Sequence, residues 1–311
     1  MLQILNVLFM YATWTSVFSI GKLTLIYAPP IFLTAARMLL AGVLLTGFYA
    51  LFKRTAFRLT KIQWLSLGIL GIFSVYLTNI FEFWALQHLT AAKTSFIYSL
   101  CPFFSALFSY IHFGEKMTKV KWLGMGIGFL GFIPVFLTQT GSESLTGGFF
   151  IFSLPELAMM AATVCTVYGW ILLRIIVKSQ NIPTGLANGI SMLFGGGLAL
   201  AHSYILDSTL LPVATENLVP FVKGTLIMTL ISNIICYNLY GYLLKRFTAT
   251  FLSFMGLLSP IFASISGWLL LGEAPSPTII FSTAIVSLGL WIVYKQELKQ
   301  GYIVKKEALA S

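Results

Sequence analysis

Residues 89–118 read LTAAKTSFIYSLCPFFSALFSYIHFGEKMT, and residues 247–276 read FTATFLSFMGLLSPIFASISGWLLLGEAPS. The two stretches align without a gap at an offset of 158 residues. The identical pairs are Thr90 with Thr248, Ala91 with Ala249, Ser95 with Ser253, Phe96 with Phe254, Leu100 with Leu258, Pro102 with Pro260, Phe104 with Phe262, Gly114 with Gly272, Glu115 with Glu273 and, further on, Gly131 with Gly289. Because Pro, Gly, Glu and Thr are among them, shared hydrophobicity does not explain the match. The alignment indicates an internal duplication.

The composition places this duplicated chain in a membrane. Its 311 residues are 58% hydrophobic and 9% charged, with a mean hydropathy of +0.91. A soluble domain carries about 25% charged residues. The chain is therefore neither a soluble enzyme, a secreted disulfide scaffold nor a disordered regulator. Its long unbroken apolar runs favour spanning helices over a β-barrel, whose strands alternate between apolar and polar residues.

Ten apolar segments are long enough to cross a bilayer. They are 4–27, 30–52, 63–86, 91–113, 120–138, 154–176, 184–206, 220–243, 249–271 and 276–295. The first is interpreted as a spanning helix rather than a removed signal peptide, since no basic residue precedes it. Five spans per copy is an odd number, so the two copies enter the membrane in opposite senses. The predicted fold is an all-α polytopic membrane protein with ten transmembrane helices arranged as two inverted five-helix repeats.

The same spans set the expected boundaries and orientation. Residues 1–140 form the first repeat, 141–153 a linker, 154–295 the second repeat and 296–311 a cytoplasmic tail. With the N-terminus in the cytoplasm, 15 of the 19 Lys and Arg residues fall in cytoplasmic segments. Lys and Arg collect on the cytoplasmic side of membrane proteins. We therefore expect a multi-pass protein of the cytoplasmic (inner) membrane with both termini inside, and the basic charge needs no nucleic-acid partner.

Three motifs carry a resemblance to a known family. They are the stretch GEKMTKVKWLGMGIGFLGF at 114–132, the opening TWTSVFSIGK at 13–22, and Arg37 early in the second span. Together they resemble the EamA module of the drug/metabolite transporter superfamily, and the resemblance covers nearly the whole chain. It implies a ten-span carrier of amino acids, nucleotide-like compounds or other metabolites. The second copy departs from the pattern, because few glycines follow its GEAPSP.

A narrower likeness lies in the run NIFEFWALQHLTAAKTSFIYSLCPFFSALFSYIHFGEKMT at 79–118. It resembles the S-adenosylmethionine/S-adenosylhomocysteine transporters of obligate intracellular bacteria. This resemblance implies exchange of these two compounds. The residues themselves leave an amino acid or another metabolite open as the substrate.

Polar and aromatic residues inside the spans are the candidates for a substrate site, because polar groups are costly in a bilayer. Asn79 and Glu82 share a helical face, and the offset of 158 places them over Tyr237 and Tyr240. The predicted substrate-binding residues are Trp14, Lys22, Arg37, Tyr76, Asn79, Glu82, Tyr98, Asn233, Tyr237 and Tyr240. Pro102 and Pro260 interrupt their spans at matched points, which makes them candidates for a hinge or for cavity-lining positions.

Each of these assignments has a structural alternative. Glu82, interpreted as the only carboxylate well inside a span, either binds a substrate cation or proton or forms an ion pair with Lys22 or Arg37. The aromatic residues either stack on a ligand or pack in the core and at the membrane interface. The prolines either act as hinges or simply pack against neighbouring helices.

The leading prediction is a secondary transporter that works by alternating access. A polytopic membrane enzyme would need clustered carboxylates or a His-Asp pair, and a channel or receptor a pore or a large loop. Without a Walker motif or metal-ligand spacing, the sequence predicts no cofactor, metal or catalytic residue. The expected partners are a small-molecule substrate and membrane lipids, with a homodimer left open.

Overall fold

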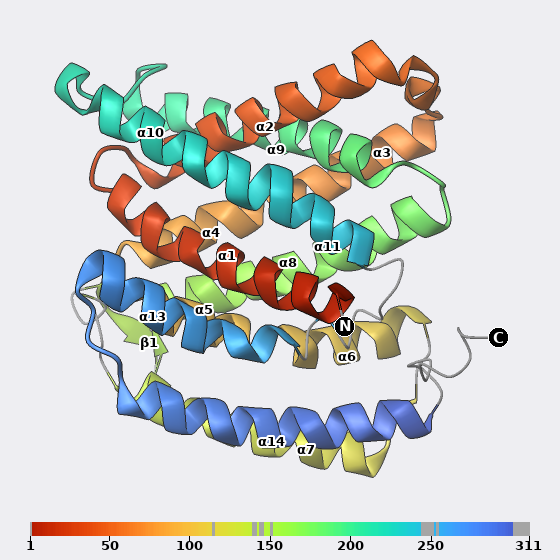
Figure 1. The fold of residues 1–311 in the computed structure, drawn as a ribbon, viewed down its shortest axis with the longest axis vertical. Coiled ribbons are helices and arrows are strands. Elements are labelled where there is room, and N and C mark those ends of the chain that lie inside the picture. The colour runs from red at the N-terminus through yellow and green to blue at the C-terminus, as the bar shows by residue number, and fades with distance from the viewer. Residues whose placement is uncertain are drawn as a thin grey trace.

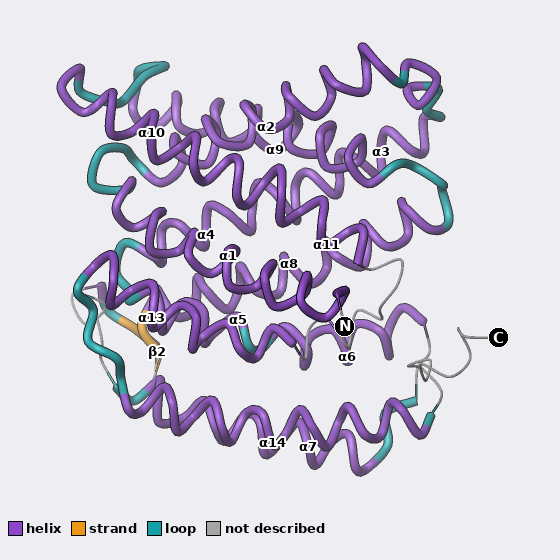
Figure 2. Tube along the Cα trace, in the orientation of Figure 1, coloured by secondary structure: helices purple, strands orange, loops and turns teal. Residues whose placement is uncertain are grey.

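The computed structural model describes residues 2–113, 116–138, 142, 146–149, 152–243, 252 and 255–300. They are almost entirely helical (Figures 1 and 2). The first half contains α1 (Leu2–Thr24), α2 (Pro30–Phe52), η1 (Arg54–Phe57), α3 (Lys61–Leu70), η2 (Gly71–Leu77), α4 (Thr78–Leu86), α5 (Ala91–Tyr98), α6 (Cys101–Phe113) and α7 (Lys119–Phe136). Two short antiparallel strands, β1 (Gly148–Phe149) and β2 (Phe152–Ser153), follow. The second half contains α8 (Leu154–Lys178), α9 (Thr184–Asp207), η4 (Thr215–Asn217), α10 (Leu218–Met228), η5 (Thr229–Cys236), α11 (Tyr237–Leu243), η6 (Gly256–Leu258), α13 (Ser259–Leu271) and α14 (Pro277–Lys299).

Several helices begin where the local sequence supplies a cap. The Thr60 hydroxyl accepts from the Gln63 backbone while the Gln63 side chain accepts from the Thr60 backbone, which starts α3. Ser153 and Glu156 form the same reciprocal pair at the start of α8. Such caps satisfy backbone N–H groups that the first helical turn leaves free. Each cap is followed by a long apolar run, which is stable as a helix in lipid because all its backbone groups are bonded internally.

The structure confirms a multi-pass helical membrane protein. Among the described residues, eight helices are long and apolar enough to cross a membrane, and they coincide with eight of the predicted spans. The first predicted span, 4–27, is a helix but is not among these eight. The ninth, 249–271, lies partly outside the described residues and otherwise forms a shorter apolar helix, Gly256–Leu271. The count of ten spans therefore stays a prediction.

Four of the predicted spans are interrupted in the described part of the chain. The third and eighth spans contain π-helical segments, η2 and η5, whose first residues Gly71 and Thr229 are 158 positions apart. The fourth span breaks at Ser99 and Leu100, just before Pro102. At the offset of 158, the short helix η6 and Pro260 occupy the same place in the second half. Both kinds of interruption thus recur at matched positions.

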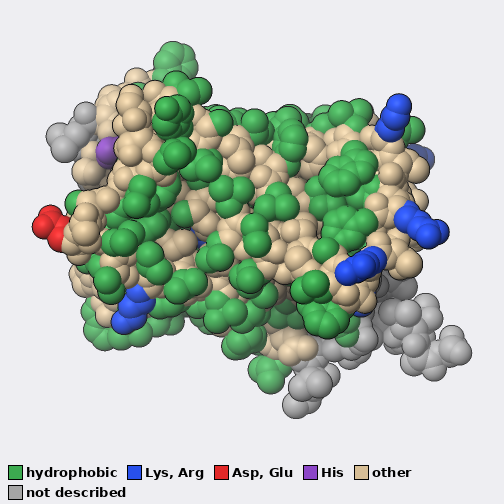
Figure 3. Space-filling model, turned by 90° about the horizontal axis from the view of Figure 1, so that it is seen from above, with side chains coloured by type: hydrophobic (Ala, Val, Ile, Leu, Met, Phe, Trp, Pro, Cys, Tyr) green, Lys and Arg blue, Asp and Glu red, His purple; other side chains and the backbone are tan. Residues whose placement is uncertain are grey.

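Helices from the two halves interleave. The closest packing joins α2 to α9, α7 to α14, α1 to α13 and α4 to α8, and each pair takes one helix from each half. In Figure 1 the helices lie side by side in layers, with α7 and α14 in one outer layer and α2 with α9 in the opposite one. The face in Figure 3 is largely apolar, with Lys and Arg gathered mainly at one end of the helices and an acidic side chain at the other. This is the surface of a protein that lies in lipid.

Glycines set the distance between α7 and α14, and they allow a stability prediction. A Cβ built on Gly289 would lie 2.5 Å from both the Gly124 carbonyl oxygen and the Gly128 backbone nitrogen. Because these are backbone atoms, the helices would have to separate. We expect Gly289→Ala to destabilise the protein by about 1–3 kcal/mol and to lower its melting temperature in detergent.

Gly126→Ala is the matched control for this prediction. Gly126 also lies on α7, but a Cβ built there meets nothing within 4 Å. Alanine is the better helix former, so the control should leave the melting temperature unchanged or raise it. Equal melting temperatures for the two variants would contradict close packing at Gly289.

Candidate functional site

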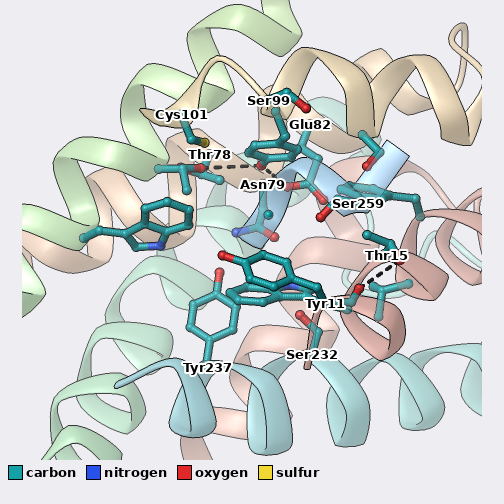
Figure 4. A pocket seen from close by; sticks show the side chains of 18 of the residues that line it. Tyr11, Thr15, Thr78, Asn79, Glu82, Ser99, Cys101, Ser232, Tyr237 and Ser259 are labelled. Carbon is teal, nitrogen blue, oxygen red and sulfur yellow. Dashed lines mark hydrogen bonds between the residues drawn. The ribbon is translucent and has the colours of Figure 1, made fainter. Parts of the chain in front are cut away.

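A cavity lies at the centre of the helices. It is lined by α1, α2, α4, α5, α6 and α8, and by η5, α11, η6 and α13 of the second half. We call it the central cavity. The predicted residues that line it are Trp14, Arg37, Asn79, Glu82, Tyr98, Pro102 and Tyr237. Figure 4 shows the labelled side chains from these elements converging on one space. Helices from both halves of the chain therefore build one cavity, and most of the predicted site residues meet there.

Two opposite charges face the central cavity. The Arg37 guanidinium donates a hydrogen bond to the Asn79 side-chain oxygen and lies 4.6 Å from the centre of the Phe83 ring. The Glu82 carboxylate accepts a hydrogen bond of 2.6 Å from the Tyr98 hydroxyl. Arg37 and Glu82 are only 2% and 9% exposed. Since buried charges are costly unless they are paired or bound, these two residues point to a ligand with charges of its own.

Aromatic rings form another wall of the central cavity. The Trp14 ring centre lies 5.5 Å from that of Tyr237 and 5.9 Å from that of Tyr240. On another side, the Phe18 ring packs against Tyr98 at 5.7 Å. Rings at these distances make favourable edge or tilted contacts. The wall offers flat apolar faces on which a ring system of a ligand could stack.

Five predicted residues lie outside the lining of the central cavity. Lys22 forms an ion pair of 2.8 Å with Glu273 and donates to the Leu89 carbonyl oxygen. Tyr240 packs behind the aromatic wall against Trp170, with ring centres 4.9 Å apart. Pro260 follows the lining residue Ser259. The Lys22 ammonium therefore braces the end of α1, and the alternative in which it pairs with Glu82 is wrong.

The remaining two, Tyr76 and Asn233, lie in the π-helical segments. The Tyr76 hydroxyl is 3.0 Å from His202 Nδ1, on the side of α9. The Asn233 amide contacts the Met38 sulfur at 2.9 Å, and the neighbouring Ser232 lines the cavity instead. In a π-helix the backbone hydrogen bonds join residues five apart, rather than four apart as in an α-helix. The wider turn changes which residues share a helical face. Tyr76 and Asn233 therefore lie outside the lining, although α-helical spacing groups them with residues that line the cavity.

Glu82 is not the only carboxylate buried within a span. Glu156, in the first turn of α8, is 1% exposed and forms an ion pair of 2.7 Å with the equally buried Lys93. As for the other alternative for Glu82, no ion pair with Arg37 is formed among the described residues. Arg37 and Glu82 are each hydrogen-bonded to a neutral partner rather than to each other.

Sequence reasoning missed many of the lining residues. They are Tyr11, Thr15, Val17, Phe18, Thr78, Ser95, Ser99, Cys101, Thr166, Trp170, Ser232, Gly256 and Ser259. One signal was available, because an offset of 156 places Trp14 over Trp170 and both line the cavity. Ser and Thr give no such signal, because their hydroxyl groups can also donate hydrogen bonds to backbone carbonyls of their own helix. Within the described part of the chain, no cluster of His, Cys, Asp and Glu suited to a metal ion is found.

Comparison with known proteins identifies one transporter family. The EamA-like transporter family matches residues 1–137 and 153–295. A Chlamydia muridarum protein named S-adenosylmethionine/S-adenosylhomocysteine transporter is 38% identical over 295 residues, covering 94% of this chain and 92% of the relative. A Chlamydia trachomatis serovar L2 protein of the same name is 38% identical, covering 94% and 89%. An uncharacterized inner membrane transporter of Escherichia coli K12 is 25% identical, covering 91% and 90%.

A solved crystal structure shares the fold. It superimposes with a TM-score of 0.64 at 19% sequence identity, covering 94% of this chain and 97% of the solved one.

Proposed function

The chain belongs to the EamA-like transporter family, and from this premise we propose that it exchanges S-adenosylmethionine for S-adenosylhomocysteine across the cytoplasmic membrane. It is a membrane transporter of a small molecule rather than an enzyme. The observation that carries the substrate proposal is the 38% identity over 94% of the chain to relatives named for these two compounds. An identity of this size over nearly the whole chain includes the helices that build the central cavity.

The chemistry of the cavity supports this substrate pair. Both compounds carry an α-carboxylate, an α-ammonium group and an adenine ring. Arg37 offers a guanidinium for the carboxylate, and Glu82 offers a carboxylate for a cationic group. Trp14 and Tyr237 offer ring faces for the adenine. A free amino acid could place its carboxylate on Arg37 but would leave the aromatic wall without a partner, so the adenosyl compounds fit the lining better.

The transport mechanism follows from the duplication. We propose ten spans in two inverted repeats, residues 1–140 and 154–295, which rock about the central cavity and open it to each side in turn. The matched segments η2 and η5, and the matched breaks before Pro102 and Pro260, support this arrangement. Cytoplasmic termini are supported by the distribution of Lys and Arg in the sequence. A homodimer stays a prediction from the sequence.

The proposal is tested by counterflow with the purified protein in liposomes. Liposomes loaded with unlabelled S-adenosylhomocysteine should take up labelled S-adenosylmethionine severalfold faster than empty liposomes or liposomes without protein. The same assay with amino acids in place of the adenosyl compounds, inside and outside the liposomes, gives the rates for comparison. Uptake of neither adenosyl compound would overturn the proposal, and faster exchange of an amino acid would replace it with the alternative substrate.

A further inference from the structure

We infer that Glu82, held by a hydrogen bond from Tyr98, is the residue that distinguishes a sulfonium cation from a neutral thioether in the central cavity. This inference rests on the proposed exchange of the two adenosyl compounds. They differ by one methyl group and one full positive charge on sulfur. A pocket that sensed only the methyl group would separate them by about 10–200-fold at most. A carboxylate at the right place senses the charge itself.

Glu82 is suited to this role by its surroundings. Among the described residues that line the cavity, it is the one acidic side chain and Arg37 the one basic side chain. Arg37 is engaged with Asn79 and forms no ion pair with Glu82. The Glu82 Oε2 atom accepts from Tyr98, whereas Oε1 makes no hydrogen bond within the described residues. One carboxylate oxygen therefore stays available to a cationic ligand.

The hydroxyl groups near Glu82 leave the Tyr98 proton to its carboxylate. Thr78 Oγ1 donates its proton to the Phe73 carbonyl oxygen at 2.8 Å, and Thr166 Oγ1 donates to Thr78 Oγ1 at 3.2 Å. Each hydroxyl has one proton, so Thr166 has none left for Tyr98, whose hydroxyl lies 3.4 Å away. The Tyr98 proton goes to the nearer acceptor, Glu82 at 2.6 Å. Tyr98 therefore donates to Glu82 alone, and the Thr78 and Thr166 protons point away from the carboxylate.

The neighbouring aromatic ring adds to the selectivity for a cation. The Phe18 ring lines the same cavity and packs against Tyr98, the partner of Glu82, with ring centres 5.7 Å apart. Ring faces attract cations within about 6 Å, and more strongly where water is excluded. A methylated sulfonium placed next to Glu82 would gain both contacts, and the thioether would gain neither.

The inference is tested by measuring the affinity of the purified protein for both compounds. Glu82→Gln keeps the shape of the side chain and removes its charge. We expect the Kd for S-adenosylmethionine to rise on the order of tenfold to a hundredfold, because the electrostatic attraction between the carboxylate and the sulfonium is lost. The Kd for S-adenosylhomocysteine should change by less than about threefold. Tyr98→Phe keeps the charge but frees the carboxylate, so it should shift the ratio in the same direction by a smaller factor.

Two controls keep the outcomes separable. Glu273→Gln alters a carboxylate outside the cavity lining, and the ratio of the two affinities should stay at the wild-type value. If Glu82→Gln does not fold, the wild-type preference for the sulfonium and the effect of Tyr98→Phe decide the question. Equal losses for both compounds, or a wild type that binds both equally, would overturn the role of Glu82 and leave the proposed function intact. A wild type that binds neither compound would overturn the proposed function instead.

Discussion

Replacing Arg37 with leucine is expected to lower exchange by about a hundredfold, because a ligand carboxylate would lose its buried counter-ion. Arg37 is 2% exposed, lines the central cavity and is held by Asn79 and by the Phe83 ring. These contacts fix the plane of the guanidinium before a ligand arrives. The change is measured as the initial rate of counterflow in liposomes containing equal amounts of folded protein.

Two further variants sharpen this prediction. Arg37→Lys keeps the charge but loses the planar fork that grips a carboxylate with two donors, so it should recover only part of the activity. Arg54→Leu removes an exposed cation whose Nε donates to the Ala50 carbonyl oxygen, far from the cavity lining. It should change the rate by less than about threefold. A leucine variant of Arg37 that transports at the wild-type rate would remove Arg37 from the site.

The second large effect concerns stability rather than transport. Lys93 and Glu156 form an ion pair of 2.7 Å, and their side chains are 1% and 2% exposed. The Lys93 ammonium also donates to the Thr138 carbonyl oxygen, so the pair ties α5, α8 and the end of α7 together. Removing one partner of a buried pair leaves an uncompensated charge and costs about 3–5 kcal/mol. We expect Lys93→Met to lower the melting temperature in detergent by several degrees.

A double variant separates the charge effect from simple loss of contacts. Lys93→Met combined with Glu156→Gln removes both charges, keeps an acceptor for the Ser153 backbone at the start of α8, and should regain part of the lost stability. Glu216→Gln, at an exposed position in η4, serves as the control and should leave the melting temperature unchanged. If the double variant were no more stable than the single one, the uncompensated charge would not be the cause.

The helices were predictable because the apolar runs are long and their ends carry local signals. Ser153 with Glu156, and Thr60 with Gln63, are readable as caps from four adjacent letters. The partners of residues far apart in the sequence were not readable in this way. Lys22 pairs with Glu273 across 251 positions, and nothing near either residue indicates the other.

The cavity lining could be predicted only in part from the sequence, and the reason is geometric. Asn79 and Glu82 lie in α4, a regular α-helix, and both line the central cavity on the face that helical spacing gives them. Tyr76 lies in η2 and Asn233 in η5, where the turn is wider, and neither is among the lining residues. A π-helical segment has no reliable sequence signature, so the register change could not be foreseen. The duplication offered one hint, because the two segments begin 158 positions apart.

The charge balance of the cavity has an electrical consequence. The two charged lining residues, Arg37 and Glu82, cancel each other within the described part of the chain, so the carrier adds no net charge to its cargo. In the proposed exchange, S-adenosylmethionine carries one net positive charge inward and S-adenosylhomocysteine returns neutral. Each cycle then moves one charge across the membrane, and a potential of 100 mV contributes about 2.3 kcal/mol. That is roughly a fiftyfold bias toward uptake, so the membrane voltage itself would drive import.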